Sequence, residues 1–458
     1  MSPHLLHEFW AGRTATFIVV TFLALNLVII ALSDPGCREV GADCHRESDR
    51  YGVFPADALL EYGSFVDPRE PTELWTKWPP GYPVMVAGLR LVLGQGSSLF
   101  PLITINLIFL LAIGWMAKLT LSTYGPRFGD LALALVLFNP NLLAFAHLVS
   151  AEMLQAFLIA LCFFLTLCYA ECPRRFWIPP VCGLLVACAT LTRPSSQFLL
   201  LLFPIALPLI VIAAGKAWAW RRALVGGILA TVVAIVAVTP WLQRQIETGE
   251  GLTFVSRHTQ HLYILDNLQF LSPERPGEAV PAYKKRLWEM EERQLDQQHP
   301  GWRELDFREE TRLRLEILDR YLDETSINAS AVIIAFVKSI GRYVLGGGEG
   351  YIHRLFGMEY QPEKSALAFY GIKVGALTFS GSVRILGLFG VLYLILQRQY
   401  ALLLLSVGLA AYFAAPHPFF SHPRYRVPAE LPLMLLAAFG ALWISNLVAR
   451  RRLSRAVE

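Results

Sequence analysis

Acidic and basic side chains lie at the ends of long apolar segments in this sequence. Asp49 follows the first apolar segment, Glu152 lies between two later ones, and Arg193 and Arg244 come at the ends of others. A carboxylate can take the proton from an attacking hydroxyl group. A guanidinium can hold a phosphate and stabilise the charge that develops on it. These residue types therefore suit a reaction at a membrane surface in which a lipid phosphate is the leaving group.

Simpler roles compete with catalysis at each position. Glu152 could serve only to stabilise a helix N-terminus, where an acidic side chain is favourable. Arg193 and Arg244 could be anchors at the membrane–water interface. Lys77, in "WTKWPPGYP", and Arg426, in "HPRYRVP", would each be solvated if they acted alone. A site is favoured because separate loops bring acids and cations to the same side of the membrane.

The composition indicates a protein that crosses a membrane several times. Of 458 residues, 55% are hydrophobic and only 17% are charged, whereas soluble globular chains carry about 25% charged residues. The net charge of +4 is too small to indicate nucleic-acid binding. Ten apolar segments approach the length of about 20 residues that a spanning helix needs. They are 14–33, 98–118, 128–147, 153–170, 177–192, 197–214, 223–240, 379–396, 400–415 and 428–448. We predict an all-α polytopic fold with about ten transmembrane helices.

The distribution of arginine and lysine predicts the orientation of these helices. If the ten segments alternate, cations such as Arg13, Arg175, Arg222 and Arg398 fall on one side, with few acidic residues beside them. Short loops rich in these residues face the cytoplasm, so both termini are predicted to be cytoplasmic. The predicted location is a bacterial cytoplasmic membrane, with the other loops on its outer, periplasmic face.

Two further apolar segments are predicted to lie on the outer membrane surface as helices. Segment 81–94 is too short to span and contains Arg90, and segment 329–347 contains Lys338 and Arg342. Counting either one alone as a span would reverse every later loop.

Three outer loops follow from this topology. They are 34–97, which contains Asp49; 241–378, with a charged helical stretch that would form a cap; and 416–428. We identify no separate hydrophobic core in the cap, so residues 1–458 are predicted to form one membrane domain.

The cysteine and histidine residues of the outer loops have structural interpretations. Cys37 and Cys44 flank a short polar stretch of the first loop. They could form a disulfide in an oxidising compartment, and two free thiols are the equal alternative. His258, His261 and His422 are interpreted as structural more readily than as ligands.

Five motifs, taken in order, resemble the GT-C superfamily of membrane glycosyltransferases. The first, "DRYGVFPADALLEYGSF" followed by "WPPGYP", is similar to the first outer loop of the bacterial branch. That branch includes the relatives of protein O-mannosyltransferases and the lipid A aminoarabinose transferases. The others are "SAEMLQAFL", "ALTRPSS", "TPWLQRQ" and "HPRYRVPAELPLMLLAA". The resemblance covers nearly the whole chain and is specific for the superfamily, but it says little about the substrate.

The resemblance implies roles for individual residues. Asp49 would be the general base or a carboxylate that orients the acceptor, and Glu152 would be the second catalytic acid. Binding of the donor phosphate or another part of the substrate is implied for Tyr51, Lys77, Arg193, Arg244, His258, Arg424 and Tyr425. The match at Lys77 is loose, because the residues that follow it differ from those of the aminoarabinose transferases.

A metal cofactor is left open by the sequence. Some members of the superfamily carry a pair of acids at the first site, whereas here the neighbour of Asp49 is Arg50. Glu47 lies two residues before Asp49, so a divalent cation such as Mg²⁺ or Mn²⁺ stays an option, but no metal ligands are assigned. The oligosaccharyltransferase branch needs such a cation, whereas this sequence shows no counterpart of that branch's large C-terminal soluble domain.

The predicted activity is transfer of a sugar from a polyprenyl-phosphate donor to a hydroxyl group of a lipid, polysaccharide or protein, with inversion. One alternative is a lipid-linked polysaccharide ligase, for which His258 or His261 would be central. A transporter or flippase would show inverted repeats and broken helices near the membrane midplane, and neither is found in the sequence. A purely structural subunit would leave the ordered motifs unexplained.

Overall fold

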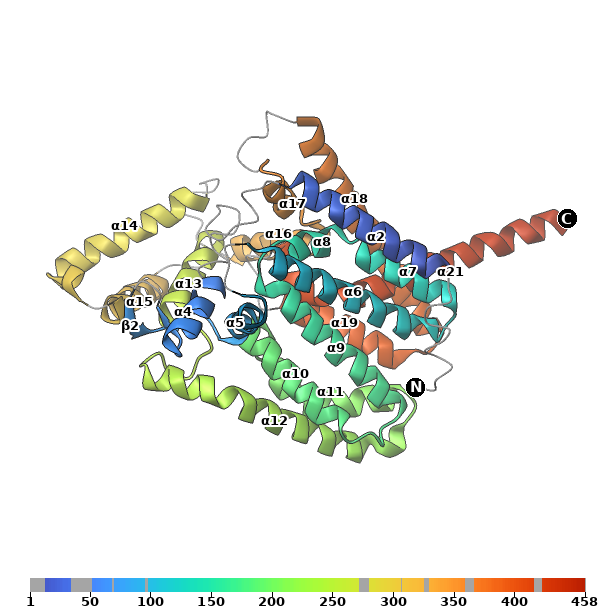
Figure 1. The fold of residues 1–458 in the computed structure, drawn as a ribbon, viewed down its shortest axis with the longest axis horizontal. Coiled ribbons are helices and arrows are strands. Elements are labelled where there is room, and N and C mark those ends of the chain that lie inside the picture. Colours follow the sequence, from blue (N-terminus) through green and yellow to red (C-terminus); the bar gives the residue numbers. More distant parts are fainter. Residues whose placement is uncertain are drawn as a thin grey trace.

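The computed structural model is a bundle of long apolar helices with shorter helices gathered at one end (Figure 1). It describes residues 13–33, 52–67, 70–94, 98–271, 280–305, 307–324, 329–358, 366–415 and 422–457. Asp49, Tyr51, Cys37 and Cys44 lie outside these residues, so the predictions for them stay predictions.

Seven helical segments of the described residues are long and apolar enough to cross a membrane. They are α2 (Arg13–Leu32), α6 (Phe100–Ser122), α9 (Ala151–Glu171), Pro194–Ala213 with η3 (Pro194–Ser196) and α11 (Leu199–Ala213), Ala217–Glu247 with η4 (Ala217–Ala219) and α12 (Trp220–Glu247), Leu367–Leu396 within α18 (Ala366–Leu396), and Pro423–Ala449, which includes most of α21 (Glu430–Val457). The predicted all-α polytopic membrane fold is confirmed. Two predicted spans form the shorter apolar helices α10 (Ile178–Thr192) and α19 (Tyr400–Ala414), so the count of ten stays a prediction.

The predicted continuous span 128–147 is broken in two. Helices α7 (Pro126–Leu137) and α8 (Pro140–His147) meet at an angle of 51°. Asn139 ends the first helix and caps the second, since its side-chain oxygen accepts hydrogen bonds from the two backbone N–H groups of residues 141 and 142. Pro140 occupies the first position of α8, where a missing N–H costs nothing. A broken helix, which the sequence was not expected to contain, is therefore present.

Two apolar clusters fill the bundle, and α9 joins them. One contains Phe163 of α9 with residues of α6, α7, α18 and α21, and the other contains Ile159 and Tyr169 of α9 with residues of α10, α11 and α12. Because α9 packs into both clusters, this helix is buried on two sides. Its first residues lie inside the bundle, near the end where the shorter helices gather.

Helices α18 and α21 approach each other closely enough that only glycine fits between them. A Cβ atom added at Gly390 would lie 1.8 Å from the backbone oxygen of Leu436, and one at Gly440 would lie 1.9 Å from that of Leu386. Small residues permit such contact between membrane helices.

Gly390→Ala should therefore lower the free energy of unfolding by about 1–3 kcal/mol, because the two helices must separate to admit the methyl group. Thermal unfolding in detergent checks this. Gly387→Ala, on the same helix, is the matched control, because its Cβ would meet the Leu436 side chain at an ordinary 3.9 Å. Equal unfolding temperatures for the two variants would contradict the prediction.

The three segments predicted to be outer loops contain helices and a short sheet. The first forms α4 (Phe54–Tyr62), a short antiparallel sheet of β1 (Val66–Asp67) and β2 (Glu70–Leu74), and α5 (Gly81–Leu93). The second forms α13 (Arg257–Leu271), α14 (Val280–Gln298), η5 (Trp302–Glu304), α15 (Phe307–Glu324), α16 (Ala329–Leu345) and α17 (Glu349–Leu355). The third leads to α20 (Pro423–Arg426) and η7 (Val427–Ala429). The described helices α4, α5, α13, α14 and α15 of the first two predicted outer loops lie at one end of the bundle (Figure 1). The sheet was not predicted.

The cap of α13, α14 and α15 has a small core of its own, which corrects the expectation of none. Leu265, Leu287 and Leu318, one from each helix, are buried against one another. The fully buried Glu291 accepts a hydrogen bond from Arg314 at 3.3 Å and lies 2.8 Å from the ring nitrogen Nε2 of His261. The apolar positions were hidden in the sequence because charged residues surround each of them.

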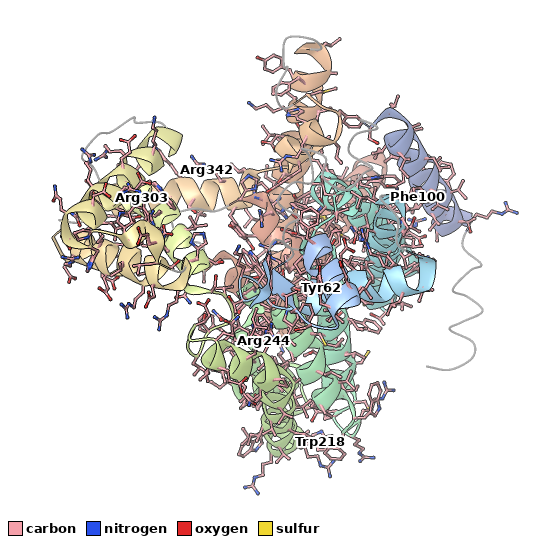
Figure 2. All side chains as sticks on the ribbon, turned by 60° about the vertical axis from the view of Figure 1, so that its left-hand side comes forward. Tyr62, Phe100, Trp218, Arg244, Arg303 and Arg342 are labelled. Atoms are coloured by element: carbon pink, nitrogen blue, oxygen red, sulfur yellow. The ribbon has the colours of Figure 1, made fainter. Side chains whose placement is uncertain are left out.

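The two segments predicted to lie on the membrane surface are separate helices. Segment 81–94 forms α5, and segment 329–347 forms α16, which exposes Ile333, Phe336 and Val337. Figure 2 shows Arg342 on α16 between the cap and the bundle. Their placement at the membrane surface stays a prediction.

Candidate functional site

A buried acid at the start of α9 is paired with two arginines from distant parts of the chain. The side chain of Glu152 is 4% exposed. One of its oxygens, Oε1, forms ion pairs with the guanidinium groups of Arg193 and Arg424, the latter at 3.1 Å from Nε. The sequence predicted all three residues for the site, and the structure brings them together.

The local sequence explains why Arg193 reaches this acid. Residues that precede a proline avoid the helical conformation, so the Arg193–Pro194 pair ends α10 with Arg193 extended at φ −149° and ψ 128°. Gln155, one turn beyond Glu152 on α9, donates hydrogen bonds of 2.8 Å to the hydroxyl groups of Ser195 and Ser196. The segment that carries Arg193 is thus fastened to the helix that carries Glu152.

Tyr425 completes this group, which we call the acid–arginine site: Glu152, Arg193, Arg424 and Tyr425. The centre of its ring lies 5.9 Å from the guanidinium carbon of Arg193 and 5.6 Å from that of Arg424. An aromatic ring attracts cations at such distances. One carboxylate with two guanidinium groups leaves one positive charge in excess, which favours an anion such as a phosphate.

Tyr351 and His422 adjoin the acid–arginine site, and sequence reasoning did not assign them to it. The hydroxyl oxygen of Tyr351 lies 3.1 Å from Nδ1 of His422. Burial, and the charges of Arg424, Arg354 and Arg342, lower the pKa of His422 to about 4, although Glu152 opposes this. Burial raises the pKa of Tyr351 to about 12. Both groups are therefore neutral at pH 7. The signal in the sequence was the position of His422, directly before the Pro-Arg-Tyr segment.

A second group of predicted residues meets around the loop at 65–77. Arg244, near the end of α12, donates a hydrogen bond to the backbone oxygen of Phe65. The ammonium group of Lys77 lies 5.5 Å from the ring centre of Trp75, and the backbone oxygen of Lys77 accepts a 3.2 Å hydrogen bond from Thr259. Figure 2 shows Arg244 at the end of α12 that faces away from Trp218.

His258 belongs to this second group. Burial lowers the pKa of His258 to about 4, with further contributions from His261, Lys77 and Arg314. Arg244 and Lys77 contact the first loop and α13, whereas Arg193 and Arg424 pair with Glu152, so the predicted residues fall into two groups. Arg244 has a structural contact that the sequence did not indicate, while its role toward a substrate stays a prediction.

Arg426 was expected to be solvated when taken alone, and this expectation is wrong. Its side chain is 1% exposed and pairs with Glu430, which is fully buried. The pattern "HPRYRVP" contains no sign of this burial, because Glu430 lies four residues further along and its other partners come from distant helices.

The end of the segment that carries Asp49 packs close to the start of α9. Val53 is fully buried in a cluster that also contains Tyr82 and Val149, and Val149 precedes Glu152 by three residues. Gly52 packs so closely on Tyr82 that a Cβ atom there would lie 2.4 Å from the ring. The start of α4 (Phe54–Tyr62) therefore shares an apolar cluster with the residues that precede α9.

The described residues do not fit a divalent metal at Glu152. Two guanidinium groups flank its carboxylate and oppose the approach of a cation. Across the part of the chain that the structure describes, no three side chains of His, Cys, Asp or Glu are grouped as metal ligands would be.

Comparison with solved structures identifies the fold. The archaeal oligosaccharyltransferase AglB from Archaeoglobus fulgidus, in complex with an inhibitory peptide and a dolichol-phosphate, aligns with 96% of this chain at a TM-score of 0.52 and 14% identity. This chain has the fold of the GT-C membrane glycosyltransferases. The GT-C resemblance predicted from the sequence is confirmed at the level of the fold. The chain covers 52% of AglB, about half of its length.

Two further similar structures are one of an A. fulgidus oligosaccharyltransferase tethered to an acceptor peptide and one of ArnT from Cupriavidus metallidurans bound to undecaprenyl phosphate. The first has 15% identity and a TM-score of 0.46, with 96% of this chain and 51% of that chain aligned. The second has 17% identity and a TM-score of 0.39, with 92% and 76% aligned. No protein-family model and no curated protein matches the sequence.

Proposed function

We propose that this GT-C chain is a glycosyltransferase that moves a sugar from a polyprenyl-phosphate-linked donor to a hydroxyl group. The observation that carries the proposal is the buried carboxylate of Glu152 between Arg193 and Arg424, with one positive charge in excess. The fold supports it, because the structure of AglB contains a dolichol-phosphate. The acceptor would be a lipid, a polysaccharide or a protein.

The residues divide the reaction between them. Asp49 takes the proton from the acceptor hydroxyl group, whose oxygen then attacks the anomeric carbon of the donor sugar. The bond between that carbon and the phosphate oxygen breaks, and the polyprenyl phosphate leaves with the bonding electrons. Arg193 and Arg424 stabilise the negative charge that grows on the leaving phosphate, and Glu152 holds them in place. Attack on the opposite face from the phosphate inverts the anomeric centre.

The position of Val53 supports Asp49 as the base. The two positions are four apart in the sequence, and so short a chain extends over at most about 14 Å. Val53 is buried in the same apolar cluster as Val149, which precedes Glu152 by three residues. We therefore propose that Asp49 reaches the acid–arginine site. Tyr51 lies in the same segment and is proposed to contact the substrate.

Lys77, Arg244 and His258 are proposed to bind the substrate from the neighbouring loop. Two of them are cations, and they meet where the first loop, the end of α12 and the start of α13 come together. We place both termini in the cytoplasm of a bacterium and the site on the outer face of its inner membrane. The position of α4, α5 and α13 to α15, from the first two predicted outer loops, at one end of the bundle supports this placement.

The alternatives receive less support. The ligase hypothesis depends on loop histidines, and His261 is buried in the cap beside Glu291. The transporter hypothesis expects broken helices, and there is a break between α7 and α8. Asn139 and Asn141, the two asparagines at this break, donate hydrogen bonds to the buried Glu430. The break therefore has a structural role, which does not require transport.

A transfer assay tests the proposal. The purified full-length chain is given radiolabelled polyprenyl-phosphate monosaccharides, one at a time, with native membrane glycolipids as acceptors. We expect label from one donor to appear in a new product. The absence of transfer from every monosaccharide donor, with folded protein, would contradict the proposal and favour the ligase.

Transfer should survive EDTA. The two guanidinium groups at Glu152 supply the positive charge that a divalent cation would otherwise provide at the leaving phosphate. The assay is repeated in 5- to 10-fold excess of chelator over any added metal, and then with Mg²⁺ or Mn²⁺ restored. Loss of transfer that either metal restores would show that a cation is required.

A further inference from the structure

A second buried ion cluster lies on the other side of α20 from the acid–arginine site. We call it the Glu430 cluster: Glu430, Arg426 and Arg384, with Asn139 and Asn141. The carboxylate of Glu430 is fully buried and lies 2.6 Å from Nε of Arg426 and 3.3 Å from Nη2 of Arg384. Each asparagine donates a further hydrogen bond of 3.1 Å. The reaction proposed above uses none of these groups.

Arg426 also binds the last turn of α16. Its guanidinium group donates hydrogen bonds to the backbone oxygens of Tyr343, Val344 at 3.0 Å and Gly346 at 2.6 Å. The last carbonyl groups of a helix have no partner within it, and a cation there is also favoured by the helix dipole. Gly346 lies so close to α20 that a Cβ atom on it would be 2.5 Å from Pro423.

The helix α20 has four residues, and its arginines point to different clusters. Arg424 pairs with Glu152, whereas Arg426 pairs with Glu430. Residues two apart on a helix do not face each other, so this short helix spans the space between the two clusters. Arg426 fixes one side of α20. Arg424 and Tyr425 belong to the same short helix, so their positions depend on how Arg426 is held.

Helix α16 connects α20 to the cap. It packs against α13 of the cap and against α18 and α20. A displacement of α16 would therefore move the carbonyl groups that hold Arg426, and with them the segment that carries Arg424.

We propose that Arg426 is a positioning residue. It fixes α20 to the last turn of α16 and to Glu430, so that Arg424 and Tyr425 meet Glu152. The geometry of the acid–arginine site therefore depends on α16, the helix that connects it to the cap. The effect on catalysis rests on the proposed function, whereas the mechanical connection between α16 and α20 does not.

The mechanical connection is tested by amide hydrogen exchange on the full chain in detergent. Arg426→Lys keeps the charge, but an ammonium group cannot hold Glu430 and three carbonyl oxygens together in the planar geometry of a guanidinium. Exchange should become faster in segments 340–347 and 422–430 together. Lys118→Arg is the control, because Lys118 on α6 forms a similar part-buried ion pair with Asp130 on α7.

Glu430→Gln provides a second variant should the lysine variant fold poorly. It removes the negative charge that pairs with Arg426 and so weakens the same ion pair. Faster exchange in both segments in either folded variant supports the proposal. Exchange that changes in only one of the two segments, or in neither, overturns it, whether or not the protein transfers sugars.

The effect on the site is tested by a double-mutant cycle with Arg424→Lys in the transfer assay. For Arg426→Lys we expect kcat/KM for the donor to fall by about 10²-fold, the size of effect that a misplacement of 1 Å can have. Most of the fall should come from KM, and the double variant should be little worse than Arg424→Lys alone. Effects that multiply would show that Arg426 does not act through Arg424. Absence of transfer by the wild type would refute the proposed function but would leave the exchange result to decide the positioning role.

Discussion

Replacing Asp49 by asparagine should lower the rate of sugar transfer by about 10²- to 10⁴-fold, the usual contribution of a general base. The amide has nearly the size of the carboxylate but cannot take a proton from the acceptor hydroxyl group. The KM for the donor should change little, because the phosphate is assigned to Arg193 and Arg424. The measurement is steady-state transfer by purified variant and wild type, using the donor that the assay identifies.

Asp57→Asn is the matched control for this prediction. Asp57 lies in the same loop, pairs with Arg90 of α5 and is half-buried, and burial raises its pKa although Arg90 opposes this. A general loss of loop structure would reduce transfer in both variants. A well-folded Asp49→Asn protein with undiminished transfer would remove Asp49 from the mechanism.

The sequence predicts the positions of the helices well because hydropathy is a local property. Each predicted span corresponds to an apolar helix or helix pair, and the acid–arginine site gathers residues from three motifs. The break at Asn139 escaped notice because hydropathy averages over a window and ignores a single capping residue. The pairings depend on distant residues, so the contacts of Arg426 and Tyr351 could not be read from their neighbours.

The core of the cap shows a different limit. In α14 and α15 apolar residues such as Leu287 and Leu318 are separated by charged ones, and each helix alone resembles a solvated surface helix. Glu291 and Arg314 count as polar in a sequence pattern, yet both are buried because they satisfy each other. Such pairing reverses the usual rule that charged residues are exposed, and only the folded chain reveals it.

Replacing Glu152 by glutamine should affect stability, binding and transfer in different directions. Removing one partner from a buried ion pair leaves the remaining charges uncompensated, which costs about 3–5 kcal/mol. The free energy of unfolding should fall toward this range, although the partial exposure of Arg424 reduces the cost. Affinity for polyprenyl phosphate should rise, because the carboxylate no longer competes with the phosphate for the two guanidinium groups. Transfer should nevertheless fall, because Glu152 no longer holds the two guanidinium groups in the positions that stabilise the transition state.

Thermal unfolding with and without polyprenyl phosphate separates these effects. At a given concentration, a ligand that binds only the folded state raises the unfolding temperature more the more tightly it binds, so the lipid should stabilise the Glu152→Gln variant more than the wild type. Glu291→Gln is the matched control, because Glu291 is an equally buried acid paired with Arg314 in the cap. This control should lose stability without any gain in the response to the lipid. An equal response in all three proteins would show that Glu152 and its arginines only hold helices together, and the phosphate would then have to be assigned to Lys77 and Arg244.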